Sequence, residues 1–299
     1  MKHVLRILLV LALPLITFGQ GLPEAEQKAI AEELKAPITL KLKNSQAITG
    51  HPVGVSEKQL QIASAKAAGE IVFTFNYDEI EVIEVPGESY KSLVMEWLEA
   101  GESMKALDLM DLLYQQRKAL LPVLPPSESN FFVLYIPLIL QSPDPARAIG
   151  VSTRLRPQIK NPAALRALDD AVLESYQRLK LFEEAVAMAK KWVEERSPYG
   201  ESALGYYVLG SDYLRRADYE TALDLALQPI VFSSLLPTDK LAHCYALAVS
   251  AALGLREHEH AALLYQEMQT RGFFWPESDS TLKPYLTEIE QHLANHEMD

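Results

Sequence analysis

Cysteine is nearly absent from this chain: Cys244 is the only one in 299 residues. The sequence therefore excludes an internal disulfide and any metal site that needs paired cysteines. No Asn-x-Ser/Thr sequence occurs either, so the chain offers no acceptor for an N-linked glycan. Exported eukaryotic domains usually carry disulfides or glycans, and the lack of both favours a bacterial periplasm for an exported chain.

Positive charge is also scarce. The chain has 28 Lys and Arg residues against 40 Asp and Glu residues, which gives a formal net charge of −12. Nucleic-acid binding depends on clustered Lys and Arg that contact phosphates, so this composition argues against a nucleic-acid partner. Hydrophobic residues make up 48% of the chain, which is enough for a folded core and excludes a disordered protein.

Sequence motifs of common enzymes are missing as well. There is no glycine-rich phosphate loop, no Gly-x-Ser-x-Gly elbow and no His-Glu-x-x-His pair. Adjacent acidic residues such as Glu183 and Glu184 diverge by about 100° on a helix, which indicates a solvent-facing surface and not a converging catalytic pair. We therefore predict a non-enzymatic protein with no catalytic residue, no metal site and no cofactor. An enzyme whose site follows no familiar motif is the alternative.

The spacing of the histidines gives little support for a metal site. His258 and His260 are two residues apart, so they point in different directions on a helix. His292 and His296 are four apart, but we expect them in a fraying C-terminal tail, residues 285–299. A zinc site needs three or four converging ligands, and we expect these side chains to be solvated.

Residues 1–19 have the pattern of a secretory signal peptide. A positive start (Lys2 and Arg6) precedes an apolar stretch of about ten residues, and small residues follow at Thr17 and Gly19, where a signal peptidase would cleave. The apolar stretch is too short for a transmembrane helix. We expect export to the bacterial periplasm with no membrane span after cleavage. A membrane anchor through an uncleaved N-terminal segment is the alternative.

Residues 37–86 alternate between apolar and polar side chains, which is the period of half-buried β-strands. This alternation predicts five short strands, with a turn at residues 67–69 and a bulge or bend at Gly50. Five short strands in about fifty residues suit a small closed or nearly closed barrel. The run from Thr39 to Ser45, followed by Ile48-Thr49-Gly50, resembles the first half of an Sm-like or SH3-like barrel. The resemblance implies a small five-stranded β-barrel-like module, and we predict a linker or short helix before it, at residues 20–36.

After residue 86 the period changes to that of amphipathic helices, and a pattern of small residues recurs through residues 87–284. Each copy carries an alanine in a similar helical stretch, and successive alanines are 37 to 40 residues apart. The marker alanines are Ala106, Ala146, Ala185, Ala222 and Ala261. Five copies predict a mainly α protein whose helices are arranged as about five pairs.

The most complete copy has Tyr206, Leu209, Gly210 and Tyr213, followed by Ala222. It resembles the tetratricopeptide (TPR) repeat, which has an aromatic residue, Leu-Gly, Tyr and Ala at these offsets. We expect Gly210 to let two helices approach closely and Tyr213 to fill the gap between them. The spacing exceeds the usual TPR length of about 34 residues, so longer loops or extended helices are expected. The resemblance covers about 200 residues and implies a TPR-like α-solenoid.

The TPR resemblance implies that the first helices of the repeats line a concave face, which binds a segment of a partner protein. The family offsets place eight residues on that face: Asp170, Glu174, Gln177, Arg178, Tyr207, Ser211, Leu214 and Arg215. Five of them are the candidate partner-binding residues, namely Glu174, Arg178, Tyr207, Ser211 and Arg215. Arg178 and Arg215 could bind a carboxylate of the partner, whereas surface charge or packing between repeats is the other interpretation. We predict an exported scaffold or adaptor with a protein or peptide partner in the cell envelope.

An accessory module that binds cell-wall or other polysaccharide is the alternative function. Its stacking platforms would be Trp192, Tyr206, Tyr207 and Trp275, although aromatic residues at helical spacing more often belong to a core. Exposure of these rings distinguishes the two hypotheses.

Two apolar features are predicted to be buried. Residues 131–140, FFVLYIPLIL, would form the first helix of the second repeat, kinked at Pro137, with a protein interface as the alternative. Cys244 lies in an alanine-rich helical pattern and would be a small core residue, with an intermolecular disulfide as the alternative.

Overall fold

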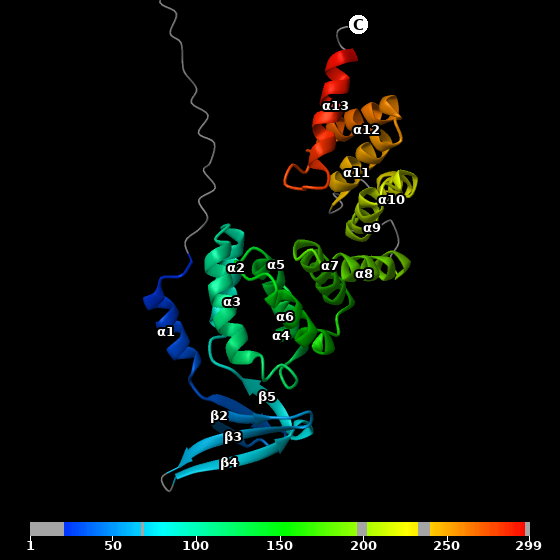
Figure 1. Ribbon diagram of the computed structural model, residues 1–299. Helices are drawn as coiled ribbons and strands as arrows, with labels where there is room; N and C mark the ends of the chain where they lie inside the picture. Colours follow the sequence, from blue (N-terminus) through cyan, green and yellow to red (C-terminus); the bar gives the residue numbers. More distant parts are fainter. Residues whose placement is uncertain (1–20, 67–68, 196–201, 233–239, 297–299) are drawn as a thin grey trace, which may run out of the picture. The chain divides into compact units, whose positions relative to one another are not determined.

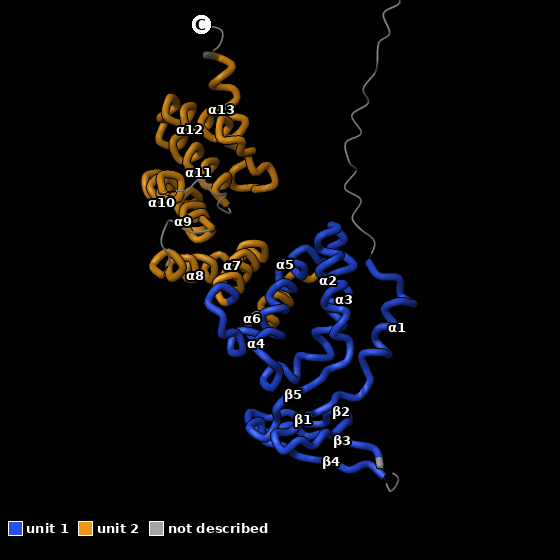
Figure 2. The backbone as a smooth tube through the Cα atoms, turned by 180° about the vertical axis from the view of Figure 1, so that it is seen from behind, with its two compact units in different colours: residues 1–142, 153–164 blue, residues 143–152, 165–299 orange. Residues whose placement is uncertain are grey.

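The computed structural model describes residues 21–66, 69–195, 202–232 and 240–296 (Figure 1). The chain divides into two compact units, which Figure 2 shows in different colours. Unit 1 comprises Met1–Ser142 and Thr153–Ala164, and unit 2 comprises Pro143–Ser152 and Leu165–Asp299. The predicted signal peptide and residues 67–68 of the predicted turn lie outside the described residues.

Unit 1 contains a five-stranded antiparallel sheet with the strand order β4-β3-β2-β1-β5. The strands are β1 (Ile38–Leu42), β2 (Ala47–Val55), β3 (Gln59–Lys66), β4 (Gly69–Asn76) and β5 (Ile80–Glu84), and the short 3-10 helix η1 (Tyr77–Glu79) precedes β5. The five predicted strands are confirmed. The predicted closure is wrong, because β4 and β5 do not pair within the described residues and the sheet is open.

Another part of unit 1 covers the apolar face of the open sheet. Leu40, Leu60 and Ile62 are completely buried, and the same cluster contains Leu120 and Leu124 from the segment that follows the third helix. That segment supplies the apolar cover that a curling sheet would otherwise supply for itself.

Close approach of two strands explains Gly50. A Cβ at Gly50 would lie 2.3 Å from the carbonyl oxygen of Ala63 on β3, so a larger residue does not fit there. The irregularity in the pairing of β2 with β3 lies slightly further along, between Pro52 and Gly54. Proline lacks the N–H that a regular ladder needs, which accounts for its place at a shift in register.

Helix α1 (Glu24–Leu34) occupies the region predicted as a linker or short helix. It buries Ile30 and Leu34 and contacts α3 (Ser103–Arg117). Asp108 of α3 accepts hydrogen bonds from the Leu22 backbone N–H at 2.8 Å and from the Gln27 side chain at 3.2 Å. These contacts fix the start of the described chain on unit 1.

The remaining helices of unit 1 include the apolar run 131–140. They are α2 (Ser89–Glu99), α4 (Pro126–Phe132) and α5 (Tyr135–Leu140); α6 (Arg147–Leu155) is divided between the units, and η2 (Arg156–Gln158) follows it. The run is largely buried, as predicted, but it is not one kinked helix. Its break falls between α4 and α5, and Pro137 lies in the first turn of α5, where its missing N–H removes no helical hydrogen bond.

A charged network is buried in unit 1. The Arg117 side chain is completely buried, and its Nε lies 3.4 Å from a carboxylate oxygen of Glu128. Arg117 also donates a hydrogen bond to the Pro86 carbonyl at 3.0 Å, and Lys91 forms a second ion pair with Glu128. Burial lowers the pKa of Arg117, and the nearby Glu128 and Glu88 oppose this shift.

Unit 2 is helical. Its helices are α7 (Pro162–Arg178, of which the first three residues are counted with unit 1), α8 (Phe182–Glu195), α9 (Leu204–Arg215), α10 (Tyr219–Phe232), α11 (Leu241–Gly254), α12 (His258–Thr270) and α13 (Lys283–His296). From α8 to α13 each helix contacts the next one (Figure 1). Helix α11 contributes most to the core, and Cys244 on it is completely buried, as predicted.

Four helix hairpins share the same turn. In each, the residue five positions before a marker alanine has a positive φ between 58° and 76°; these residues are Gly101, Lys180, Ala217 and Arg256. The following residue donates its N–H to the carbonyl five positions back, at 2.8–3.0 Å, which is the Schellman arrangement that ends a helix. The marker alanines Ala106, Ala185, Ala222 and Ala261 are at most 1% exposed. The same helix-ending turn therefore recurs four times in the described part of the chain.

The fifth predicted copy is wrong. Ala146 is exposed, lies just before α6 and follows no turn with a positive φ. The apolar helices α4 and α5 lie in this part of the sequence, and their burial does not depend on a small residue.

The C-terminal region also differs from the prediction. The residues expected to be a tail form most of α13, whose Ile289 is completely buried, and α13 contacts both α11 and α12. Burial of this apolar residue holds the helix against its neighbours.

The close approach predicted at Gly210 is present. A Cβ on Gly210 would lie 2.5 Å from Cδ2 of Leu247, so α9 and α11 meet at a position that needs glycine. Tyr213 is half-buried against the same core.

Candidate functional site

A polar cavity of about 430 Å³ lies in unit 2, and we call it the polar groove. The end of α7, one face of α9, the start of α11 and the loop before α13 form its walls. Its lining residues are Glu174, Gln177, Arg178, Lys180, Phe182, Tyr207, Ser211, Arg215, Lys240, His243, Ser278, Asp279, Ser280 and Thr281.

All five candidate partner-binding residues line the polar groove. Glu174 and Arg178 are one turn apart on α7, and Tyr207, Ser211 and Arg215 recur every four residues on α9. Tyr207 and Ser211 are buried and form the floor, whereas Arg178 and Arg215 are exposed at the rim. The structure therefore places the predicted residues together, and their role in binding stays a prediction.

Four cations line the polar groove, and two of them are engaged. Arg215 forms an ion pair with Asp212 at 3.1 Å, and its guanidinium lies 3.9 Å from the centre of the Phe182 ring. Lys240 forms an ion pair with Glu174 at 3.1 Å. Arg178 and Lys180 have no ion-pair partner among the residues that the structure describes, so two positive charges are available to a ligand.

His243 is kept neutral in the wall of the polar groove. Burial lowers its pKa to about 4, the nearby Lys240 adds to this effect and Glu174 opposes it. The ring meets Tyr207 edge to face, with 5.0 Å between ring centres. The Tyr207 hydroxyl donates to Asp279, and this carboxylate also accepts the backbone N–H of Thr281 at 2.8 Å. The acidic groups of the groove are thus engaged within it.

Ser211 has an unused hydroxyl in the polar groove. The residue is only 4% exposed, and its Oγ has no hydrogen-bond partner among the described residues. Ser211, His243 and Asp279 therefore share one cavity, but no hydrogen bond joins the serine to the histidine. A nucleophile and its general base are usually joined by such a bond.

Metal ligands do not converge in the described part of the chain. No group of three or more His, Cys, Asp or Glu side chains is placed to hold an ion there. His260 lies 3.2 Å from Glu257, and the ring of His258 stacks on that of His292 at 5.1 Å between centres. The side chain of His296 lies outside the described residues.

The aromatic residues of the polysaccharide hypothesis are mostly unavailable. Trp192, Tyr206 and Tyr207 are at most 6% exposed, so no sugar ring can stack on them. The Trp192 indole N–H donates to Asp170 at 2.6 Å, which holds this side chain inside the unit. Trp275 is half-buried and lines a different cavity.

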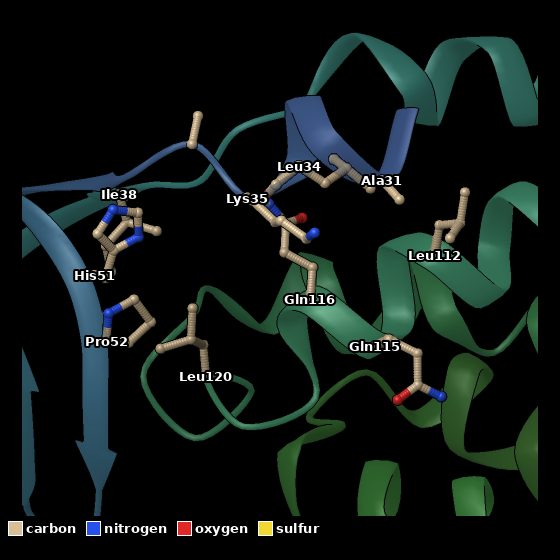
Figure 3. A pocket seen from close by; sticks show the side chains of 11 residues that line it. Ala31, Leu34, Lys35, Ile38, His51, Pro52, Leu112, Gln115, Gln116 and Leu120 are labelled. Carbon is tan, nitrogen blue, oxygen red and sulfur yellow. Dashed lines mark hydrogen bonds between the residues drawn. The ribbon is translucent and has the colours of Figure 1, made fainter. Parts of the chain in front are cut away.

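Unit 1 has a cavity of about 570 Å³ between α1, α3 and the sheet (Figure 3). Leu34 and Ala31 of α1, Leu112 of α3 and Pro52 of β2 give it apolar walls. The Gln116 amide donates to the Leu34 carbonyl at 2.7 Å, so this polar side chain serves to hold α1 in place. The cavity presents few polar groups that could orient a ligand, and no site residue was predicted there.

Several residues of the polar groove were not predicted from the sequence, namely Lys180, Lys240, His243 and Asp279. Lys180 lies in a hairpin turn, His243 begins the next repeat and Asp279 lies in a loop. Only Lys180 could have been predicted as a groove residue from the sequence. It follows Arg178 by two residues in the turn after α7, and such a turn lies at the edge of the face that α7 presents to the groove.

Comparison with known proteins finds no match to this chain among family models, curated proteins or solved structures. No helix in the described part of the chain is both long enough and apolar enough to cross a bilayer.

Proposed function

We propose that this chain is a non-enzymatic scaffold or adaptor that holds an acidic segment of a protein partner in the polar groove. The observation that carries the proposal is the charge of the rim. Arg178 and Lys180 face the groove without a carboxylate partner among the described residues. Exposed cations at the edge of a partly buried cavity attract anionic groups, and arginine can bind a carboxylate with two parallel hydrogen bonds.

The floor of the polar groove suits a peptide ligand. Ser211 offers a hydroxyl that lacks a partner, and a ligand carbonyl or carboxylate could accept its hydrogen bond. Glu174 and Asp279 are bound to Lys240 and Tyr207, which limits their repulsion of an incoming carboxylate. A volume of about 430 Å³ accommodates a few side chains and not a folded domain.

The recurring hairpins support a finer proposal. We propose that they form a TPR-like array and that the chain is exported to the bacterial periplasm, where its partner is a protein of the cell envelope. The shared turn geometry and the buried marker alanines support the array, and the pattern of residues 1–19 supports export.

A peptide array tests the proposed ligand class. The chain from residue 20 to residue 299 is applied to peptides in which Asp and Glu are replaced stepwise by Asn and Gln. We expect binding to increase with the number of carboxylates and to fall with added salt. Peptides that bind equally well without their carboxylates would contradict the proposal.

A charge reversal tests the site. Arg178→Glu should weaken binding of the best acidic peptide by roughly tenfold to a hundredfold, because a hydrogen bond to a charged group contributes about 1.5–3 kcal/mol. Lys190→Glu is the matched control, since Lys190 is an exposed cation of unit 2 outside the groove lining. Equal losses in both variants would show that only the overall charge matters.

A further inference from the structure

A second cavity of unit 2 has aromatic walls and the opposite charge. It has a volume of about 430 Å³, and we call it the aromatic pocket. Its lining includes the loop between α12 and α13; Figure 1 shows where these two helices lie. Its chemistry comes from Tyr265, Phe273, Phe274, Trp275, Glu277 and Glu290.

The exposure of Phe274 is unusual for so large an apolar side chain. Phe274 is 87% exposed, whereas Met268 in the same lining is 1% exposed. The pocket therefore has a buried floor and an open aromatic wall. Burying Phe274 against a ligand would remove apolar surface from water, which favours binding.

The charges of the aromatic pocket are all negative. Glu277 and Glu290 contribute carboxylates, and no Lys, Arg or His is among the residues that line the pocket. The pKa of Tyr265 is raised by burial and also by the negative charge of Glu290. In addition, the buried Nε1 of Trp275 has no hydrogen-bond acceptor among the described residues. An indole, a phenol ring and two benzyl rings thus lie beside two carboxylates.

We infer that the aromatic pocket binds the alkylammonium or guanidinium group of a Lys or Arg side chain from a protein partner. A cation gains from the faces of Trp, Tyr and Phe rings, and nearby carboxylates strengthen the attraction. The apolar stem of such a side chain covers aromatic surface while its charged end reaches the carboxylates.

The two cavities of unit 2 share a loop. Phe273, Phe274, Trp275 and Glu277 line the aromatic pocket, and Ser278 to Thr281 line the polar groove. The linings therefore meet between residues 277 and 278. A partner segment that carries both signs of charge could occupy both cavities, but the inference about the aromatic pocket does not rest on the groove.

Trp275 provides a direct measurement in the full chain from residue 20. The chain has three tryptophans, so its indole N–H groups give three NMR signals, and Trp275→Phe identifies the one from the pocket. The probe is a short peptide with one central Lys or Arg, compared with the same peptide carrying norleucine at that position. We expect the Trp275 signal to shift when the cationic peptides are added. The norleucine peptide should bind roughly tenfold more weakly.

Variants of the wall complete the test. Phe274→Ala and Glu290→Gln should each weaken binding of the cationic peptides about five- to tenfold. Their controls are Leu263→Ala and Glu288→Gln, which change exposed residues of α12 and α13 outside the lining. Phe274 and Glu290 are both exposed, so neither variant should impair folding. The inference would be overturned if the Trp275 signal does not shift with the cationic peptides, or if it shifts only with a cell-wall oligosaccharide.

Discussion

Protonation of His243 links the polar groove to pH. Its pKa is about 4 in the folded chain, against an ordinary value of 6.5. Between these two values the unfolded chain binds a proton that the folded chain does not, so the free energy of unfolding must rise with pH in this window. At pH 7 both states are mostly neutral at this residue, and the penalty is small.

The size of the effect follows from the two pKa values. Between pH 7 and pH 5 His243 should reduce the free energy of unfolding by about 2 kcal/mol, and the full penalty below pH 4 is roughly 3 kcal/mol. His243→Gln cannot be protonated and should lose less stability over the same interval. The difference between the two chains isolates His243 from carboxylates that titrate in both.

An NMR titration of the histidine ring protons tests this prediction most directly. The signal missing from His243→Gln identifies the residue, and its midpoint should lie near pH 4. Urea unfolding of both chains at pH 7 and pH 5 then measures the energetic difference. A His243 midpoint near 6.5, or stability curves that run parallel, would refute the burial of an uncharged imidazole in the groove wall.

The remaining predictions concern stability and are measured by urea unfolding followed by circular dichroism. Arg117→Met should cost about 3–5 kcal/mol, because it leaves Glu128 as a buried charge with less compensation, and Arg117→Met/Glu128→Gln should cost less than the single variant. Equal costs would contradict the described pairing. Gly101→Ala should cost roughly 1 kcal/mol through backbone strain alone, since φ is +76° and no atom lies within 4 Å of the added Cβ. Ala217→Gly should gain roughly 0.5–1 kcal/mol at the equivalent turn, and a loss there would contradict the shared turn geometry.

Much of the fold could be predicted because the local period of the sequence is strong. The alternation around Leu40 and Ile62 predicted strands, and the marker alanines predicted helices that cross closely. Strand pairing is less predictable. The cover supplied by Leu120 and Leu124 comes from a distant segment and leaves the sheet open, which no local pattern reveals.

The helix turns show why the repeat copies could be predicted only in part from the sequence. Three of the four shared turns place Lys180, Ala217 or Arg256 at a positive φ, where glycine is usual. The turn signal is therefore hidden in the sequence, and Ala146 was mistaken for a marker because its spacing alone was suitable.

The candidate site was predictable where it lies on helices. Family offsets on α7 and α9 selected eight residues, and all except Asp170 and Leu214 line one groove, because residues four apart share a helix face. Asp279 and His243 were missed, since a loop and the start of another helix bring them in from distant parts of the sequence.

Photo-cross-linking from the polar groove tests the central claim most directly. Gln177 lines the groove and is half-buried on α7, so a photoreactive amino acid at this position reports what the groove holds in intact cells. Position Lys190 on α8, outside the groove, is the control. We predict one stoichiometric adduct from position 177, mapped by mass spectrometry to an acidic segment of an envelope protein and lost with Arg178→Glu. No protein adduct, or the same adducts from both positions, would contradict the account.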